Sequence, residues 1–237
     1  ERVQISLDGG VTWTNTTLDR PANMWILDNT TATLVDGTYT VVSRVIDQAG
    51  NIGTSSVPQN VIIDTAIPTS LASITSISED TGVNTSDFIT KDSTLVINGK
   101  VSTALASNEK VQVSFDNGAS WVDATSKADG TWSYDNTAQT LQDGTYTVQA
   151  RVIDTAGNSS TVATQSFTVD TKVPTALSDL DLKDDVGAIK GTIPEQGVTD
   201  DTRPEFTGKA PADAAYVNIY DNGNLMGTAT VQADGTW

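Results

Sequence analysis

An eight-residue motif occurs twice in the chain, as "RVIDQAGN" from Arg44 and as "RVIDTAGN" from Arg151, 107 residues apart (151 minus 44). Other segments recur at nearly the same spacing, including "DGTYTV" at Asp36 and Asp143. Self-similarity at a fixed spacing is the signature of a repeated structural unit. The fold must therefore be one that about 106 residues can form and that can be used more than once along the chain.

The copies are out of phase with the ends of the sequence. Glu1 aligns with Glu109, and Trp237 aligns with Trp132. We predict one complete repeat at residues 67–172, preceded by the back part of a repeat at 1–66 and followed by the front part of another at 173–237. This phase predicts that the sequence is cut from a longer array.

Within each copy, apolar and polar residues alternate with a period of two, and dipeptides such as Asn117-Gly118 mark turns between the alternating segments. One face of the segment after Thr145 is the predicted core face, and it carries Tyr146, Val148, Ala150 and Val152. About seven short strands per roughly 100 residues predict an all-β fold. We expect tandem immunoglobulin-like β-sandwich domains with Greek-key connections, in which the terminal copies are incomplete.

Aromatic residues also recur at fixed positions of the repeat. Five tryptophans occupy two such positions beside turns: Trp13 with Trp121, and Trp25 with Trp132 and Trp237. Their recurrence favours a packing role, whereas a row of exposed aromatic rings would instead suit sugar binding. The tyrosines that follow the Asp-Gly turns, Tyr39 and Tyr146, are placed like the structural corner tyrosine of such sandwiches.

The composition narrows the possible functions. Thirty acidic against 13 basic residues give a formal net charge of −17, which disfavours nucleic acid and anionic membranes as partners. No apolar run is long enough for insertion into a membrane. The sequence has no histidine and no cysteine, so catalytic triads, thiol catalysis and the usual zinc ligands are absent. We predict that this segment is not an enzyme, although a glycosidase needs only two carboxylates and remains an alternative.

Acidic residues gather at the two predicted junctions between repeats. The stretch from Asp170 to Asp201 holds eight acids against three lysines, and a thinner group follows Asp64 at the first junction. Two acids recur at equivalent positions, Asp47 with Asp154 and Asp64 with Asp170. We expect Asp47 and Asp154, which lie in the "AGN" loops, to be near the junction that follows their own repeat.

Carboxylates brought close together repel each other unless a cation or a rise in pKa relieves the repulsion. Calcium suits such a group because it binds through oxygen atoms alone. A solvated acidic surface that keeps the chain soluble is the alternative explanation. The recurrence of the acids favours calcium, since solubility does not require equivalent positions.

Several motifs follow one another in a specific order: "VDTKVP" at Val169, "KDDVGAIKGTI" at Lys183, "TDDTRPEFTGKA" at Thr199, and "DGTYTVQARVIDTAGN" at Asp143. In this order they resemble the bacterial immunoglobulin-like repeats of giant RTX-type, type I secreted adhesins and of biofilm-associated surface proteins. The resemblance covers nearly the whole chain. It implies a non-catalytic extender on the bacterial cell surface that supports adhesion or biofilm formation, with the host or surface ligand bound elsewhere in the parent protein.

The resemblance also implies Ca²⁺ at the junctions, where it stiffens the contact between neighbouring repeats of the same chain. The candidate metal ligands are Asp47, Asp64, Glu79, Asp80, Asp154, Asp170, Asp184 and Asp185. The first junction departs from the pattern, because "EDTG" at Glu79 replaces "DDVG". A carbohydrate-binding or accessory β-sandwich module of a secreted polysaccharide-active protein is the alternative function.

Overall fold

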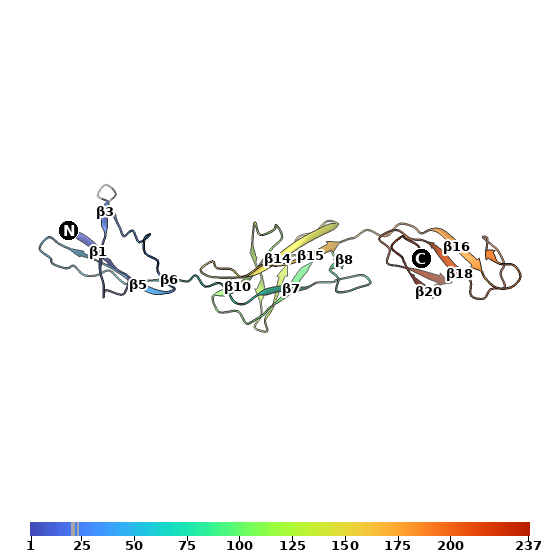
Figure 1. Cartoon of the computed structure of the whole chain (residues 1–237), viewed down its shortest axis with the longest axis horizontal. Coiled ribbons are helices and arrows are strands. Elements are labelled where there is room, and N and C mark those ends of the chain that lie inside the picture. Colours follow the sequence, from blue (N-terminus) through green and yellow to red (C-terminus); the bar gives the residue numbers. More distant parts are fainter. Residues whose placement is uncertain (20–21, 23) are drawn as a thin grey trace. The chain divides into compact units, whose positions relative to one another are not determined.

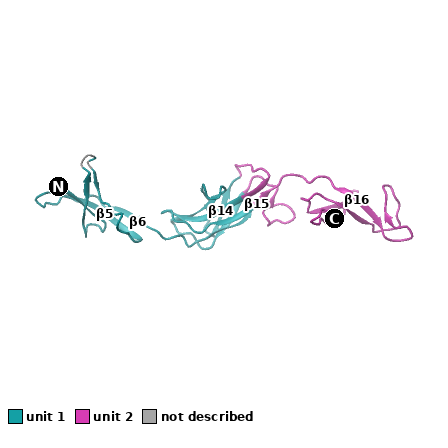
Figure 2. Ribbon diagram, turned by 45° about the horizontal axis from the view of Figure 1, so that its top comes forward, with its two compact units in different colours: residues 1–76, 96–136, 147–166 teal, residues 77–95, 137–146, 167–237 magenta. Residues whose placement is uncertain are grey.

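The computed structural model describes residues 1–19, 22 and 24–237, and every regular element in these ranges is a β-strand (Figure 1). It divides into two compact units (Figure 2): residues 1–76, 96–136 and 147–166 form the first, and residues 77–95, 137–146 and 167–237 form the second. The described residues include no helix long and apolar enough to cross a membrane. The prediction of an all-β fold is confirmed.

The N-terminal part of the first unit contains one sheet and one separate hairpin. The sheet has the order β2-β1-β5-β6 and is antiparallel throughout, with bounds Arg2–Ser6 (β1), Thr14–Asn15 (β2), Gly37–Ile46 (β5) and Gln59–Ile63 (β6). The hairpin pairs Thr17–Asp19 (β3) with Met24–Ile26 (β4).

The predicted complete repeat, residues 67–172, contains two sheets. The five-stranded sheet has the order β11-β10-β14-β15-β8 and consists of Val122–Asp123 (β11), Glu109–Ser114 (β10), Gly144–Asp154 (β14), Ala163–Val169 (β15) and Ile89–Thr90 (β8). The four-stranded sheet has the order β12-β13-β9-β7 and consists of Thr125–Ser126 (β12), Thr131–Asp135 (β13), Val96–Val101 (β9) and Ala72–Ile77 (β7). Nine strands thus replace the predicted seven, because several edge segments pair over only two residues.

One pairing in these two sheets is parallel, whereas an immunoglobulin-like sandwich is built from antiparallel sheets. Strand β8 runs parallel to β15, with Ile89 opposite Thr168 and Thr90 opposite Val169. The chain leaves the four-stranded sheet after β7 and enters the five-stranded sheet at β8, with the segment 78–88 between them. Such a crossover brings the short strand in beside β15 without a hairpin, so the antiparallel rule does not apply to it.

The core is formed by the inward faces of both sheets. On β14 the predicted face is buried: Val148, Ala150 and Val152 are inaccessible to solvent, and Tyr146 is half-buried. Other strands of the first unit also contribute buried side chains: Val111 and Val113 on β10, Ile97 on β9, and Trp132 on β13. The period-two alternation therefore identified the buried face correctly.

The two corner tyrosines have the predicted structural role. The hydroxyl of Tyr39 donates to the carbonyl of Val35 at 3.0 Å, and that of Tyr146 donates to the carbonyl of Gln142 at 2.9 Å. Both bonds fasten the start of a long strand to the loop before it, which keeps the two copies locally alike.

The C-terminal part of the second unit has a three-stranded sheet, β17-β16-β18, and a hairpin, β19-β20. Their bounds are Ser178–Asp184 (β16), Gly191–Thr192 (β17), Glu205–Lys209 (β18), Tyr216–Asp221 (β19) and Asn224–Thr230 (β20). Near the end of the chain, Lys209 and Thr236 form an isolated antiparallel β-bridge. The backbone N–H of Trp237 donates a hydrogen bond to the carbonyl of Gly208. The same contacts join Thr131 to Lys100 and Trp132 to Gly99 in the complete repeat, as the sequence alignment of the copies requires.

Candidate metal centre

The "AGN" loop after β14 is organised by Asp154. Its Oδ1 accepts hydrogen bonds from the backbone N–H groups of Ala156, Gly157 and Asn158 at 2.8 to 2.9 Å. Its Oδ2 accepts from Nδ2 of Asn158 at 2.9 Å. The bond from the Asn158 side chain, together with the backbone N–H donors, lowers the pKa of Asp154, so its carboxylate is held ionised.

The first copy has the same loop. Asn51 donates to Asp47 from its backbone N–H at 2.8 Å and from its side chain at 2.7 Å, and these bonds lower the pKa of Asp47. Both acids therefore cap their own loop. This use of the carboxylates leaves Oδ2 as the oxygen with spare acceptor capacity in each copy.

The first junction brings a linker residue to the Asp154 loop. Nδ2 of Asn158 donates to the backbone carbonyl of Asp64 at 3.0 Å, across 94 positions of sequence. The Asp64 side chain accepts the N–H of Ala66 through Oδ1 at 3.1 Å. Two of the predicted acids, Asp64 and Asp154, are thus linked through Asn158.

Glu109 is a further acid beside the Asp154 loop, and the sequence-based ligand set did not include it. It begins β10 and lies directly opposite Asp154 in the antiparallel register. The two residues line a common surface hollow of about 560 Å³. A signal was available, because Glu1 stands at the equivalent position of the first copy.

The predicted position of Asp154 at the following junction is wrong. Asp154 ends β14, whereas Asp143 precedes the first residue of that 11-residue strand. Asp143 accepts hydrogen bonds from Thr171, the neighbour of Asp170. Asp154 and the Asp170 segment therefore belong to opposite ends of one strand. The error arose because the loop was assigned to a junction without knowing the direction of the strand that carries it.

Asp170 itself has local partners. Its backbone N–H donates to the carbonyl of Thr90 at 2.9 Å, and its Oδ1 accepts from the N–H of Lys172 at 3.1 Å. It resembles Asp64 in this second contact, which confirms that the two linkers have the same local conformation.

Glu79 and Asp80 lie in the loop between β7 and β8. Glu79 has a positive φ of 47°, and its carbonyl accepts a hydrogen bond from the hydroxyl of Thr90 at 2.6 Å. Asp80 accepts the N–H of Phe88 through Oδ2 at 3.0 Å, whereas its Oδ1 is buried with no hydrogen-bond partner. A buried carboxylate oxygen without a donor is costly unless a cation neutralises it, so this atom fits a metal ligand.

The equivalent loop of the third copy contains Asp184 and Asp185. Asp184 accepts the hydroxyl of Thr199 through Oδ2 at 2.6 Å and the N–H of Val186 through Oδ1 at 3.0 Å. The Asp200 carboxylate lies so close to Gly187 that a Cβ there would collide with it. Asp185 is exposed. Asp200 therefore brings a further carboxylate from another segment to this loop, although the sequence-based ligand set omitted it.

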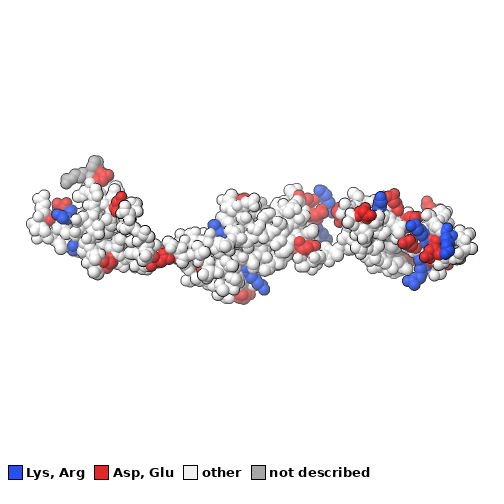
Figure 3. Space-filling model, in the orientation of Figure 1, with Lys and Arg blue, Asp and Glu red and all other residues white. Residues whose placement is uncertain are grey.

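Acidic side chains are spread over the surface in view (Figure 3). Within residues 1–19, 22 and 24–237, no three acidic side chains lie close enough to hold one metal ion by themselves. The carboxylates bind protein donors instead. A calcium ion at the Asp154 loop, or at the loops that hold Asp80 and Asp184, would need to combine a few carboxylate oxygens with backbone carbonyl, amide or water oxygens. Calcium accepts such a ligand set.

Trp13, Trp121 and Trp132 are positioned for packing, whereas Trp25 on β4 is exposed and does not follow the prediction. The guanidinium of Arg151 covers the Trp121 ring, and that of Arg44 covers the Trp13 ring, each at 4.0 Å from the ring centroid. Trp132 is buried in the core. These contacts favour the packing role over a sugar platform, because a sugar ring would have to displace an arginine from a covered face.

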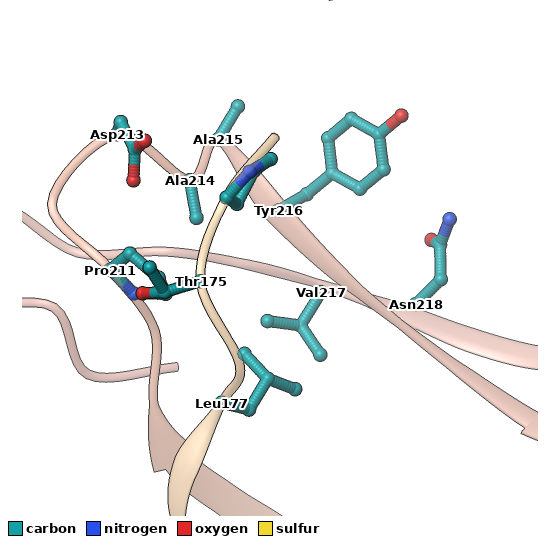
Figure 4. A pocket seen from close by; sticks show the side chains of 10 residues that line it. Thr175, Leu177, Pro211, Asp213, Ala214, Ala215, Tyr216, Val217 and Asn218 are labelled. Atoms are coloured by element: carbon teal, nitrogen blue, oxygen red, sulfur yellow. The ribbon is translucent and has the colours of Figure 1, made fainter. Parts of the chain in front are cut away.

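A separate hollow of about 420 Å³ lies in the C-terminal part of the chain (Figure 4). Pro174, Leu177 and Val217 give it an apolar wall, and Asp213 is the single acid among its described lining residues. Hydrolysis of a glycosidic bond by the usual mechanism uses a pair of carboxyl groups. This hollow does not supply such a pair.

The family model of the bacterial Ig-like domain matches residues 1–65 and 68–171. No curated protein matches the chain at a significant level.

Solved structures that are similar over the full length of the chain include the following three. One is a tetra-tandem repeat in the extending region of a large adhesion protein (23% identity, 57% of that chain covered, TM-score 0.29). Another is a Ca²⁺-stabilized adhesin that helps an Antarctic bacterium bind ice (19% identity, 55% of that chain covered, TM-score 0.38). The third belongs to a 1.5-MDa bacterial ice-binding adhesin (22% identity, 73% of that chain covered, TM-score 0.34). The chain thus spans little more than half the length of the first two.

Proposed function

Because the chain belongs to the family of bacterial Ig-like domains, we propose that it is a non-catalytic spacer segment of a bacterial cell-surface adhesin, stiffened by calcium at the junctions between repeats. Its partners are the neighbouring repeats of the same chain, divided near residues 66 and 172. The adhesive ligand is bound elsewhere in the parent protein, which acts outside the cell in adhesion or biofilm formation.

The observation that carries this proposal is the meeting of linker and loop at the first junction. Asn158 joins the Asp64 carbonyl to the Asp154 carboxylate, and Glu109 lies opposite Asp154. The linker, the loop and the strand therefore each place one acidic residue near the start of the second repeat, where an ion would also need carbonyl, amide or water oxygens. Neutralising their charge with a cation would hold linker, loop and strand together.

The residues of this chain would supply hard oxygen ligands. Asp64, Asp154 and Glu109 would contribute at the first junction, with Asp170 at the equivalent linker position of the second. Asp80, and Asp184 with Asp200, would contribute within the loops after β7 and β16. Calcium supplies a divalent charge and flexible coordination by six to eight oxygens. Asn158 and the backbone N–H groups of the loop hold the carboxylate of Asp154 ionised, because their hydrogen bonds lower its pKa.

Thermal unfolding with calcium titrated against magnesium tests the proposal. We expect the unfolding midpoint to rise with calcium and not with equal concentrations of magnesium, because folded-state binding stabilises by mass action. Asp154→Asn and Glu109→Gln should reduce the rise, whereas Asp129→Asn, on an exposed turn, should not. Equal unfolding midpoints with both ions would contradict a specific calcium site and would favour the alternative of a solvated acidic surface.

A further inference from the structure

The linker of the first junction is fastened to the repeat before it. Oδ1 of Asp36 accepts two hydrogen bonds from Thr65, one from its backbone N–H at 3.1 Å and one from its hydroxyl at 2.8 Å. At the second junction, Asp143 accepts the same two bonds from Thr171, at 3.0 and 2.7 Å. Since the arrangement recurs at the equivalent residues, it is a regular part of the repeat.

The same linker is also fastened to the repeat after it. The carbonyl of Asp64 accepts a hydrogen bond from Nδ2 of Asn158 at 3.0 Å, and this contact is partly buried. The Asn158 side chain is held in place, because its amide also donates to Oδ2 of Asp154. The contact is therefore made by a side chain that the loop has already oriented.

Asp64 and Thr65 are consecutive, and each is held by a different repeat. We propose that Asp36, Thr65, the Asp64 carbonyl and Asn158 form a hydrogen-bonded linker clasp that fixes the orientation of neighbouring repeats without any metal ion. The inference rests on the proposed spacer function and deepens it. Calcium would then reinforce a junction that is already ordered.

The charges at the junction agree with a hydrogen-bonded clasp that orders the linker and a calcium ion that reinforces it. The contact with Asn158 joins a neutral amide to a neutral carbonyl, so it persists when the surrounding acids lack a cation. It also holds the Asp64 backbone beside the Asp154 loop, leaving the Asp64 carboxylate, which has one weak partner in the N–H of Ala66, for other ligands. The linker clasp thus pre-positions the acids of the proposed metal site, which reduces the conformational freedom that binding must remove.

Residual dipolar couplings of the full chain in excess chelator test the linker clasp. When two domains are rigidly joined they share one alignment, whereas a free hinge averages the couplings of one relative to the other. The comparison is between residues 1–63 and residues 72–169. The variants are Asp36→Ala, which removes the acceptor of Thr65, and Asn158→Asp, which removes the amide donor.

Two variants at equivalent positions are matched controls. Asp143→Ala breaks the same contact at the other junction, and Asn51→Asp disturbs the same loop in the first copy, where no linker contact is present among the described residues. Chemical shifts of the core strands verify that each variant is folded.

In chelator, we expect the wild type to give nearly equal alignment for the two repeats. Asp36→Ala removes two hydrogen bonds to the linker and Asn158→Asp removes one. Each clasp variant should lower the ratio of the two alignment magnitudes by about twofold, and both controls should keep it unchanged. Unequal alignment of the wild type without metal, or unchanged ratios in both clasp variants, would overturn the linker clasp. If calcium alone then equalised the alignments, the proposed calcium function would still stand.

Discussion

The guanidinium of Arg151 lies over the ring of Trp121, 4.0 Å from its centroid, and Arg44 lies over Trp13 in the same way. In both copies the tryptophan indole also donates to a glycine carbonyl in its own turn, Gly118 or Gly10. The stack therefore binds the turn after β10 or β1 to the long strand that carries the arginine.

Replacing this arginine should weaken the fold without changing any binding of sugars. We expect Arg151→Ala to lower the free energy of unfolding by about 1 kcal/mol, the scale of a partly exposed cation–π contact. Arg151→Lys should recover part of the loss. Urea unfolding measures the change, and a glycan panel provides the control: glycan binding by the wild type that is lost in Trp121→Ala would restore the carbohydrate-binding alternative.

Gly99 makes a second prediction possible, because it has no room for a side chain. A Cβ at this position would collide with the Trp132 ring and with the backbone carbonyl of Ser73. We expect Gly99→Ala to destabilise the protein by about 1 to 3 kcal/mol, the usual range for overpacking. Gly227→Ala is the matched control, since a Cβ at Gly227, also within a strand, meets nothing within 4 Å. Equal unfolding midpoints for the two variants would contradict the close packing.

Replacement of Asp80 should change the stability of the protein in opposite directions with and without calcium. Its buried Oδ1 has no hydrogen-bond partner, so Asp80→Asn removes an uncompensated charge and should raise metal-free stability by about 1 kcal/mol. The same change should remove part of the stabilisation by calcium. Asp87→Asn, at an exposed acid of the same loop that accepts the N–H of Ile89, serves as control. A uniform loss of stability in both conditions would show that Asp80 is no ligand.

The turns after β10 and β1 make stability depend on pH. Hydrogen bonds from the Ser120 side chain and backbone, and then from Ser114, lower the pKa of Asp116 from 3.8 to about 2. Its equivalent, Asp8, also has a lowered pKa through bonds from Ser6 and Thr12. A lowered folded-state pKa stabilises the protein fully above the unfolded value and is lost as pH falls through the folded value.

Stability should therefore decrease between about pH 4 and pH 2. Asp116→Asn lacks the titrating group, and its unfolding midpoint should fall less steeply over this interval than that of the wild type. Thermal unfolding at closely spaced pH values makes the comparison. Parallel curves for the two proteins would mean that the Ser114 and Ser120 bonds do not favour the ionised carboxylate.

Local patterns predicted the fold well because they depend on neighbouring residues. Alternation along one strand is enough to place Val148 and Val152 in the core, and a tyrosine after an Asp-Gly turn is enough to predict the corner bond of Tyr146. The parallel contact of β8 was not predictable in this way, since it depends on where the chain crosses from one sheet to the other.

The candidate site was harder to predict because it depends on strand direction and register. Recurrence selected Asp64 and Asp154, but it could not tell which end of the repeat carries the Asp154 loop. Glu109 was overlooked because its importance comes from standing opposite Asp154 across two strands. The contact of the Asn158 side chain with a linker 94 positions away is likewise not visible in the sequence.

Strand β14 connects two of the contacts described above, since Asp143 and its bonds to Thr171 precede it and the Asp154 loop with Asn158 follows it. Tension that entered the repeat at one linker and left at the other would pass first into β7 and β15, the strands that continue into the two linkers. Strand β15 is paired with β14 and β8, and these ladder hydrogen bonds lie across the strand direction. A pull on the second linker along β15 would therefore load them together in shear and would not open them one after another.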